Sequence, residues 1–227
     1  MTGPPPLLWL SPGDDPSRLP DPAGALAEPN GLLAAGGALT PEWLLAAYRR
    51  GIFPWFGPGQ PILWWSPDPR AVIEPERFKR SKSLGQSIRN RGYETAIDRD
   101  FAAVLAGCAA PRAGESGTWI TPSMRRAYQE LHRLGRAHSF ETWLDGALVG
   151  GLYGVRLGGV FFGESMFSRA RDASKVALAR LVDWARAEAV ELIDCQLPTP
   201  HLASLGAENV PRDRFLARLA PLVARAR

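Results

Sequence analysis

The sequence predicts an α+β fold in which a small proline-rich N-terminal domain, residues 1–71, precedes a larger domain, residues 72–227. Two observations lead to this prediction. Most of the 21 prolines fall within the first 75 residues, and such a density excludes long helices and central strands there. From residue 72 onward, helix and strand patterns follow one another, and antiparallel strands with helices before and after them are typical of α+β proteins.

The N-terminal domain contains one helix with clear boundaries. Thr40 is a suitable N-cap, Pro41 fits the first helical position, and Gly51 ends the helix. The apolar face of this helix consists of Leu44, Ala47 and Tyr48. So short a domain cannot bury its many aromatic side chains alone, so we expect them to pack on the larger domain. They are Trp43, Phe53, Trp55, Phe56, Trp64 and Trp65.

The larger domain is expected to alternate helices and strands. Caps and apolar periodicity predict helices at residues 81–90, 98–109 (with Asp98 as the cap), 121–134, about 173–189, and from about 212 onward. Turn residues and apolar runs predict strands at residues 137–144, 147–155, 160–162 and 190–197. Asp145-Gly146 between the first two strands is a strong hairpin signal.

Composition excludes several classes of protein. Hydrophobic residues make up 45% and charged residues 22%, as in ordinary globular domains. No apolar run is long enough to cross a membrane, and the first residues lack the pattern of a signal peptide. Two cysteines, Cys108 and Cys195, cannot build a disulfide framework, so we expect a cytoplasmic protein without a membrane partner. The net charge of +4 is compatible with an anionic partner.

Several catalytic motifs are absent. The sequence has no G-x-x-x-x-G-K-S/T phosphate loop, and its three histidines lack zinc-ligand spacing. Residues 163–167 begin like the turn that carries a hydrolase serine, but Phe167 stands where that turn needs glycine. We therefore expect no metal and no cofactor, and a substrate that is already activated.

Polar residues interrupt two apolar strands of the larger domain. In the strand at 190–197, a period of two places Leu192, Asp194 and Gln196 on one face. Glu164 follows the end of the strand at 160–162. Burying a carboxylate costs several kcal/mol unless it is paired, so such groups often mark a site. The alternative is that they bond backbone groups at strand ends.

Six sequence blocks together carry a resemblance to a known family. They are Gly51-Ile52-Phe53-Pro54-Trp55-Phe56, Leu63-Trp64-Trp65-Ser66-Pro67-Asp68-Pro69-Arg70, Gly117-Thr118-Trp119-Ile120-Thr121, Gly163-Glu164-Ser165-Met166-Phe167, Leu192-Ile193-Asp194-Cys195-Gln196, and His201-Leu202-Ala203-Ser204-Leu205-Gly206-Ala207. In their order and spacing, these blocks resemble those of bacterial leucyl/phenylalanyl-tRNA–protein transferases. The resemblance covers roughly residues 20 to 219, whereas the first 18 residues match nothing recognisable.

The resemblance implies an aminoacyltransferase that moves Leu or Phe from leucyl-tRNA or phenylalanyl-tRNA to the α-amine of proteins with N-terminal Arg or Lys. The product is an N-degron, a signal for protein degradation. The family's C-terminal domain is similar to the N-acetyltransferase (GNAT) fold, with a mostly antiparallel mixed sheet flanked by helices. This chain lacks the coenzyme A loop Q/R-x-x-G-x-G/A of that superfamily, which fits an RNA donor. A monomer is expected.

The resemblance also implies site residues. Asp194, Gln196 and Glu164 are the catalytic candidates: Asp194 takes the proton of the attacking nitrogen, Gln196 fixes the geometry or donates to the oxyanion, and Glu164 orients Gln196 or the acceptor. Trp55 and Trp119 match residues that flank the terminal adenosine, although both also suit a core. Positions around the aminoacyl side chain are matched by Leu152, Phe161 and Met166, which composition cannot distinguish from core residues.

A basic stretch is the candidate tRNA-binding surface. It contains six cations with no acid between them: Arg77, Lys79, Arg80, Lys82, Arg89 and Arg91. An RNA acceptor stem would account for this charge, and the alternative is an ordinary solvated face. Two further classes stay open from the residues alone, a non-catalytic RNA-binding module and a small-molecule N-acyltransferase.

Overall fold

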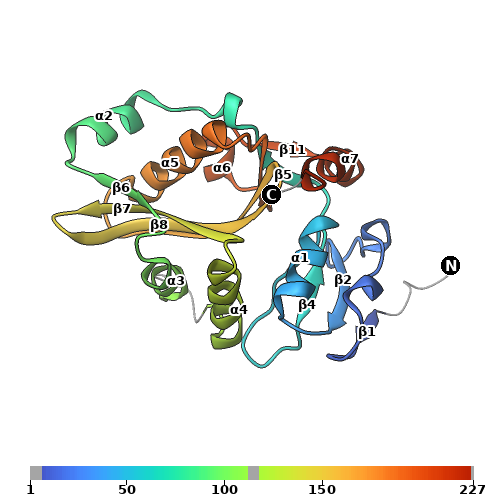
Figure 1. The fold of residues 1–227 in the computed structure, drawn as a ribbon. Helices are drawn as coiled ribbons and strands as arrows, with labels where there is room; N and C mark the ends of the chain where they lie inside the picture. Colours follow the sequence, from blue (N-terminus) through green and yellow to red (C-terminus); the bar gives the residue numbers. More distant parts are fainter. Residues whose placement is uncertain (1–6, 112–117, 226–227) are drawn as a thin grey trace.

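A computed structural model describes residues 7–111 and 118–225 of the chain. Its N-terminal part holds a four-stranded sheet in the order β1-β2-β4-β3, beside helix α1 (Figure 1). These elements are β1 (Leu8–Leu10), β2 (Leu32–Gly36), α1 (Pro41–Arg49), β3 (Phe53–Pro54) and β4 (Leu63–Trp65). As predicted, the Thr40 hydroxyl caps α1 by accepting from the Trp43 amide at 3.4 Å. Gly51, with a φ of +70°, follows the end of this helix.

The larger sheet has seven strands in the order β11-β5-β10-β9-β8-β7-β6. The strands are β5 (Arg70–Ile73), β6 (Glu94–Ile97), β7 (Ala137–Leu144), β8 (Ala147–Leu157), β9 (Val160–Ser168), β10 (Leu192–Gln196) and β11 (Glu208–Val210). Within this sheet, β9 and β10 run parallel and the other neighbours run antiparallel. The predicted α+β fold with a mostly antiparallel mixed sheet is therefore confirmed.

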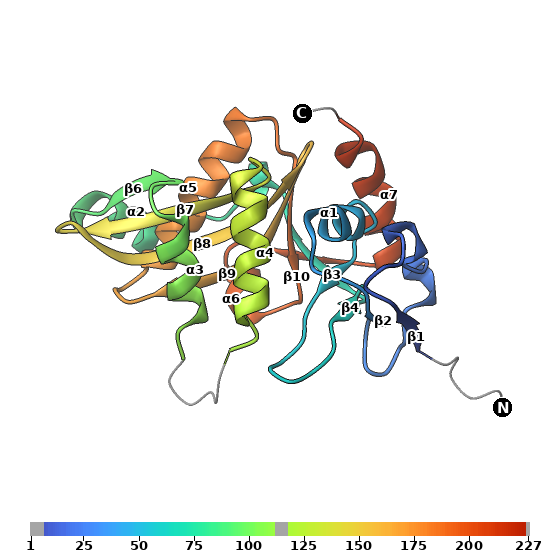
Figure 2. The same cartoon turned by 60° about the horizontal axis from the view of Figure 1, so that its bottom comes forward.

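Helices cover both faces of the larger sheet (Figures 1 and 2). On one face lies α5 (Ala173–Ala187), with α2 (Lys82–Asn90) packed against it and α6 (Pro200–Ser204) nearby. On the other face lie α3 (Phe101–Ala109) and α4 (Pro122–Arg133), whereas α7 (Arg212–Val223) contacts α1. None of the helices in the described ranges is long and apolar enough to cross a membrane.

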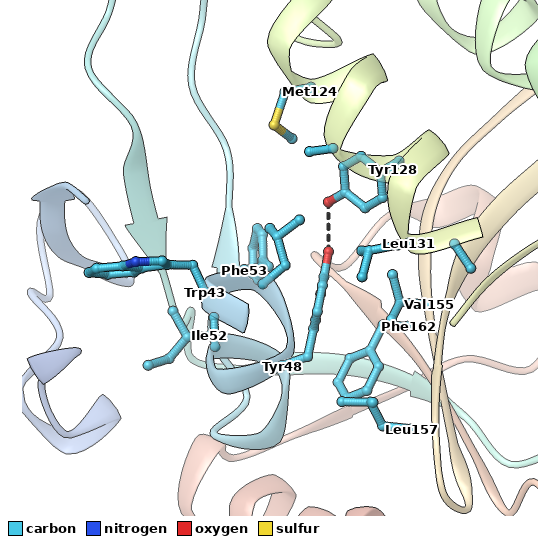
Figure 3. Close-up of a cluster of buried hydrophobic side chains, with 14 of the residues drawn as sticks. Trp43, Tyr48, Ile52, Phe53, Met124, Tyr128, Leu131, Val155, Leu157 and Phe162 are labelled. Carbon is cyan, nitrogen blue, oxygen red and sulfur yellow. Dashed lines mark hydrogen bonds between the residues drawn. The ribbon is translucent and has the colours of Figure 1, made fainter. Parts of the chain in front are cut away.

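Each face of the larger sheet has its own hydrophobic core. The core under α5 includes Phe140 and Phe161, whereas the opposite core joins α3 and α4 to the N-terminal elements (Figure 3). Four of the six N-terminal aromatics, Trp43, Phe53, Phe56 and Trp64, are buried members of this shared core, whereas Trp55 is exposed. The predicted domain boundary after residue 71 falls inside β5, so the last two residues of the N-terminal segment pair within the larger sheet.

Two predicted elements differ from the structure. Helix α3 begins at Phe101, because Asp100 caps it by accepting from the Ala103 amide at 2.9 Å, and Asp98 instead accepts from the Ser139 amide at 2.7 Å. Strand β9 continues to Ser168, so Glu164 lies inside a strand and not after its end. The short strands β5, β6 and β11 escape sequence analysis, since three or four residues show no clear periodicity.

Candidate active site

The parallel strands β9 and β10 pair over three residues and then separate. Their shared register ends at the pair Asp194 and Phe162. Beyond it, β9 follows β8 to Ser168, and β10 follows β5 to Gln196. Each strand has a bulge here, with Glu164 as the extra residue of β9 and Cys195 as that of β10. Bulges redirect side chains, and this fork holds all three catalytic candidates.

Asp194 is fully buried in an ion pair with Arg70, which is also fully buried. Arg70 Nε donates to Oδ1 at 2.8 Å, and Nη2 donates to Oδ2 at 2.6 Å. The backbone amide of Gln196 also donates to Oδ1, at 2.9 Å. The rings of Phe53 and Phe215 lie 4.8 and 4.7 Å from the guanidinium carbon. Both carboxylate oxygens are therefore engaged, and Asp194 has no exposed surface from which to take a proton.

Gln196 does not share a face with Asp194. The register pairs Asp194 with Val72 but Gln196 with Ala71, and adjacent residues of β5 point to opposite faces. The bulge at Cys195 and the left-handed backbone of Gln196, with a φ of +58°, interrupt the alternation. The prediction of a shared face is thus wrong. A cavity of about 240 Å³ adjoins this strand end, lined by Ala71, Pro198, Thr199, Pro200, Ala203, Ala207 and Asn209.

Glu164 is half-buried and bonded to two tyrosines from other elements. Tyr48 of α1 donates to Oε1 and Tyr128 of α4 donates to Oε2, both at 2.6 Å. The two hydroxyl oxygens are also 2.6 Å apart, and Figure 3 marks the hydrogen bond between them with a dashed line. Burial raises the pKa of Glu164 to about 7, although the tyrosine hydrogen bonds act in the opposite direction. A carboxyl group that titrates near neutral pH is suited to exchanging protons.

Sequence reasoning missed three residues of this site. Tyr48 is identified there only as part of an apolar helix face, and Tyr128 and Arg70 receive no role, although Arg70 ends one of the six blocks. In the chain, Tyr48 lies 116 residues from Glu164, and Arg70 lies 124 residues from Asp194. No periodic signal connects residues so far apart, so only the fold brings them together.

The two candidate tryptophans differ in exposure. Trp55 follows β3 and is 41% exposed, and the centre of its ring lies 5.6 Å from that of Trp65 in an edge-to-face arrangement. Trp119 is half-buried against the core, shortly before α4 begins. The loop after β3 runs beside the N-terminal end of α4 in Figures 1 and 2. The structure thus brings the two segments to one side of the molecule and leaves the Trp55 ring available for stacking.

The three apolar candidates lie together under α5. Leu152 and Phe161 are buried and Met166 is half-buried, and all three belong to the same core. Leu152 and Met166 are direct partners across β8 and β9. This core lies on the opposite face of the sheet from Tyr128, which belongs to the other core.

The basic stretch begins before α2 and ends directly after it, and all six of its cations are exposed. Arg77 pairs with Glu74 and Glu208, and Arg80 pairs with Asp183. No ion pair of the other four is found in the described part of the chain; they are Lys79, Lys82, Arg89 and Arg91.

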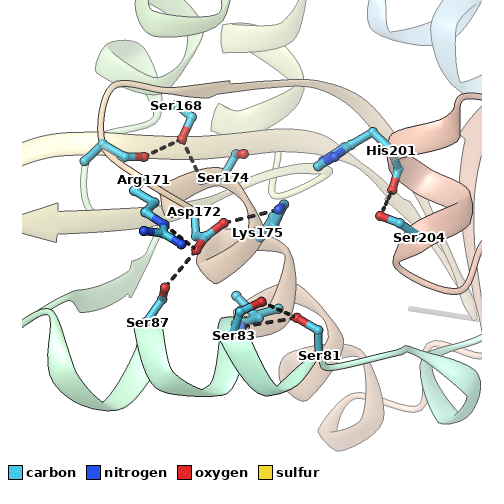
Figure 4. A network of polar contacts seen from close by, with 12 residues as sticks. Ser81, Ser83, Ser87, Ser168, Arg171, Asp172, Ser174, Lys175, His201 and Ser204 are labelled. Carbon is cyan, nitrogen blue, oxygen red and sulfur yellow. Dashed lines mark hydrogen bonds and ion pairs between the residues drawn. The ribbon is translucent and has the colours of Figure 1, made fainter.

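Asp172 connects the basic helix α2 to the start of α5 (Figure 4). Its carboxylate accepts from the Ser87 hydroxyl at 2.8 Å and from Lys175 Nζ at 3.2 Å. Helix α2 is therefore fastened to α5, with its cations facing solvent. Across residues 7–111 and 118–225, no group of three or more His, Cys, Asp or Glu side chains is placed to hold a metal ion.

Comparisons with known proteins identify an enzyme of the aminoacyl-tRNA transferase class. Residues 72–220 match the family model "Leucyl/phenylalanyl-tRNA protein transferase", and residues 37–68 match the N-terminal domain model of the same family. The leucyl/phenylalanyl-tRNA–protein transferase of Azoarcus sp. is 58% identical over 94% of this chain and 89% of its own length. That of Chromohalobacter salexigens is 60% identical over 88% of this chain and 78% of its own length. The chain belongs to the leucyl/phenylalanyl-tRNA–protein transferase family, and the resemblance seen in the sequence is confirmed.

Solved structures with a similar fold are more distant. A GCN5-related N-acetyltransferase from Kribbella flavida is 13% identical, with a TM-score of 0.42 over 75% of this chain and 61% of that protein. FemX is 10% identical, with a TM-score of 0.48 over 75% of this chain and 66% of its own. At this level of likeness neither protein supports a conclusion about substrates.

Proposed function

We propose that this protein transfers Leu or Phe from leucyl-tRNA or phenylalanyl-tRNA to the α-amine of proteins that begin with Arg or Lys, which creates an N-degron. Membership of the family supports the tRNA-dependent transfer. The structural observation that carries the proposal is Glu164, a half-buried carboxyl at the β9–β10 fork whose pKa of about 7 suits proton exchange. We also propose that the protein acts in the cytoplasm as a monomer.

The aminoacyl-tRNA binds across both faces of the fork. Trp55 and Trp119 hold the terminal adenosine by stacking, which is worth about 1–3 kcal/mol per base. The Leu or Phe side chain reaches the apolar core under α5, at Leu152, Phe161 and Met166. The basic stretch 77–91 contacts phosphates of the acceptor stem, which makes binding sensitive to salt. An ester donor carries its own activation, so transfer requires no nucleotide hydrolysis.

The acidic residues divide the work at the fork. Glu164 accepts the proton of the attacking nitrogen, because it is the carboxyl with exposed surface and a pKa near neutrality. Asp194 acts as a positioning residue that holds Arg70 and the Gln196 amide, since both of its oxygens are engaged. Gln196 fixes the geometry at the strand end or donates to the oxyanion. This assignment places Glu164 before Asp194 as the proton acceptor.

The choice of acceptor follows from local charge. An N-terminal Arg or Lys brings two cationic groups, its α-ammonium and its side chain. Arg70 neutralises Asp194, so Glu164 provides the uncompensated negative charge at the fork. The 240 Å³ cavity that adjoins β5 and the end of β10 offers space for the first residues of the acceptor. We therefore expect acceptors that begin with Asp or Glu to fail.

A competition assay tests the proposal. Purified protein is incubated with radiolabelled Leu-tRNA or Phe-tRNA and a mixture of peptides that differ only in the first residue. We expect label on the α-amine of the Arg and Lys peptides, and preference over the Asp peptide beyond the roughly fivefold that about 1 kcal/mol of one surface ion pair explains. Equal transfer to the Asp peptide would refute the specificity. Absence of transfer to any peptide would refute the catalytic proposal.

A further inference from the structure

Tyr48, Tyr128 and Glu164 form a closed ring of three oxygen–oxygen contacts. Each contact is 2.6 Å long: Tyr48 to Glu164, Tyr128 to Glu164, and Tyr48 to Tyr128. Three separate elements, α1, α4 and β9, each contribute one member. Every contact of this length needs one bridging hydrogen to be a hydrogen bond.

The number of hydrogens in the ring depends on Glu164. Each phenol has one hydrogen and an ionised carboxylate has none, so the ionised ring has two hydrogens for three contacts. One pair of oxygens is then in close contact with no hydrogen between them. A proton on Glu164 supplies the third hydrogen, and each side chain can then donate once and accept once. The ring is complete only when it holds one additional proton.

The surroundings of the ring make Glu164 the member that exchanges this proton. Burial and the adjacent Glu164 charge raise the pKa of both Tyr48 and Tyr128 well above the ordinary value, so both phenols stay protonated. Three further groups influence the ring: Tyr153 from β8, Asp194 from β10 and Arg70 from β5. Asp194 and Arg70 neutralise one another. The Tyr153 hydroxyl is buried and makes no hydrogen bond within the described residues.

We propose that Tyr48 and Tyr128 are positioning residues that turn Glu164 into a temporary store for the proton that moves during aminoacyl transfer. The inference rests on the proposed function. The acceptor reacts as the neutral amine, after its ammonium group has released one proton to water. As its nitrogen bonds to the ester carbon, one N–H bond breaks and that proton passes to Glu164. The bond between that carbon and the ribose oxygen then breaks, and the oxygen takes the proton from Glu164. The carboxylate is regenerated, and no further reactant is consumed.

The test compares three Tyr→Phe variants, each of which removes one buried hydroxyl. In Tyr48→Phe and Tyr128→Phe we expect kcat to fall about 10- to 100-fold, while KM for the aminoacyl-tRNA stays within about twofold. The matched control is Tyr153→Phe, which removes a buried hydroxyl that makes no hydrogen bond to any residue the structure describes, and we expect wild-type kcat and KM. Because either single change opens the ring, the double variant should be little slower than either single variant. Urea unfolding checks that each variant is folded.

Several results would overturn the inference. Wild-type kcat in folded Tyr48→Phe or Tyr128→Phe would show that the ring does not assist transfer. An equal loss in Tyr153→Phe would assign the effect to packing. If Tyr48→Phe or Tyr128→Phe does not fold, Glu164→Gln is tested instead, because an amide cannot store the proton. Wild-type kcat in Glu164→Gln would refute the proposal that Glu164 stores the transferred proton. A wild-type protein without transfer would refute the proposed function itself, whereas active wild type with normal phenylalanine variants would refute the ring alone.

Discussion

Replacing Glu164 by glutamine should change how the stability of the protein depends on pH. The folded protein raises the pKa of Glu164 from 4.5 to about 7, mainly because burial disfavours the charged carboxylate. This difference of about 2.5 pH units corresponds to about 3 kcal/mol. Because the folded-state pKa lies above the unfolded value, the contribution to stability is fully present below pH 4.5 and is lost as pH rises through 7.

The Glu164→Gln variant lacks this ionisation, and its amide can still exchange hydrogen bonds with Tyr48 and Tyr128. As pH rises from 4.5 to 8.5, the wild type should therefore lose about 3 kcal/mol of unfolding free energy that the variant keeps. Urea unfolding of both proteins at the two pH values measures the difference. Glu94→Gln, at an exposed position of β6, serves as the control. If the unfolding free energies of wild type and Glu164→Gln changed with pH in the same way, folding would not shift the pKa of Glu164.

Three further predictions concern the ion pair, the stacking residue and the basic surface. Asp194→Asn should lower the free energy of unfolding by about 3–5 kcal/mol, because Arg70 would lose its buried counter-charge; unchanged urea unfolding would contradict this. Trp55→Ala should weaken aminoacyl-tRNA binding by about 1–3 kcal/mol with little effect on stability, since the ring is 41% exposed; equal binding in a filter assay would remove it from the donor site. Lys82→Ala should reduce the slope of log K against log salt by about 0.9 if Lys82 contacts a phosphate. Arg77→Ala should reduce it less, because Arg77 is already paired with Glu74 and Glu208, and equal slopes would refute this distinction.

Local sequence signals were sufficient for much of the fold. The Thr121-Pro122 start of α4 and the Thr40-Pro41 start of α1 were predictable because capping depends on residues within one turn. The β7–β8 hairpin was predictable from Asp145-Gly146, whose φ angles of +50° and +76° suit those residues. The family was recognisable because six separated blocks occur in a fixed order, which chance composition does not produce.

The arrangement of the candidate site depended on tertiary structure. The sequence by itself determined that Asp194 and Gln196 are polar residues within an apolar strand, and that Glu164 is a polar residue next to another apolar strand. Only the fold decided that a bulge turns the Gln196 side chain away from that of Asp194. The fold also decided that Arg70 forms hydrogen bonds with the Asp194 carboxylate, and that Tyr48 and Tyr128 donate hydrogen bonds to Glu164. The physical reason is how far apart in the chain the interacting residues lie. Caps, turns and periodicity act within a few residues, whereas the pKa of a carboxyl depends on burial and on partners that folding brings from more than 100 positions away.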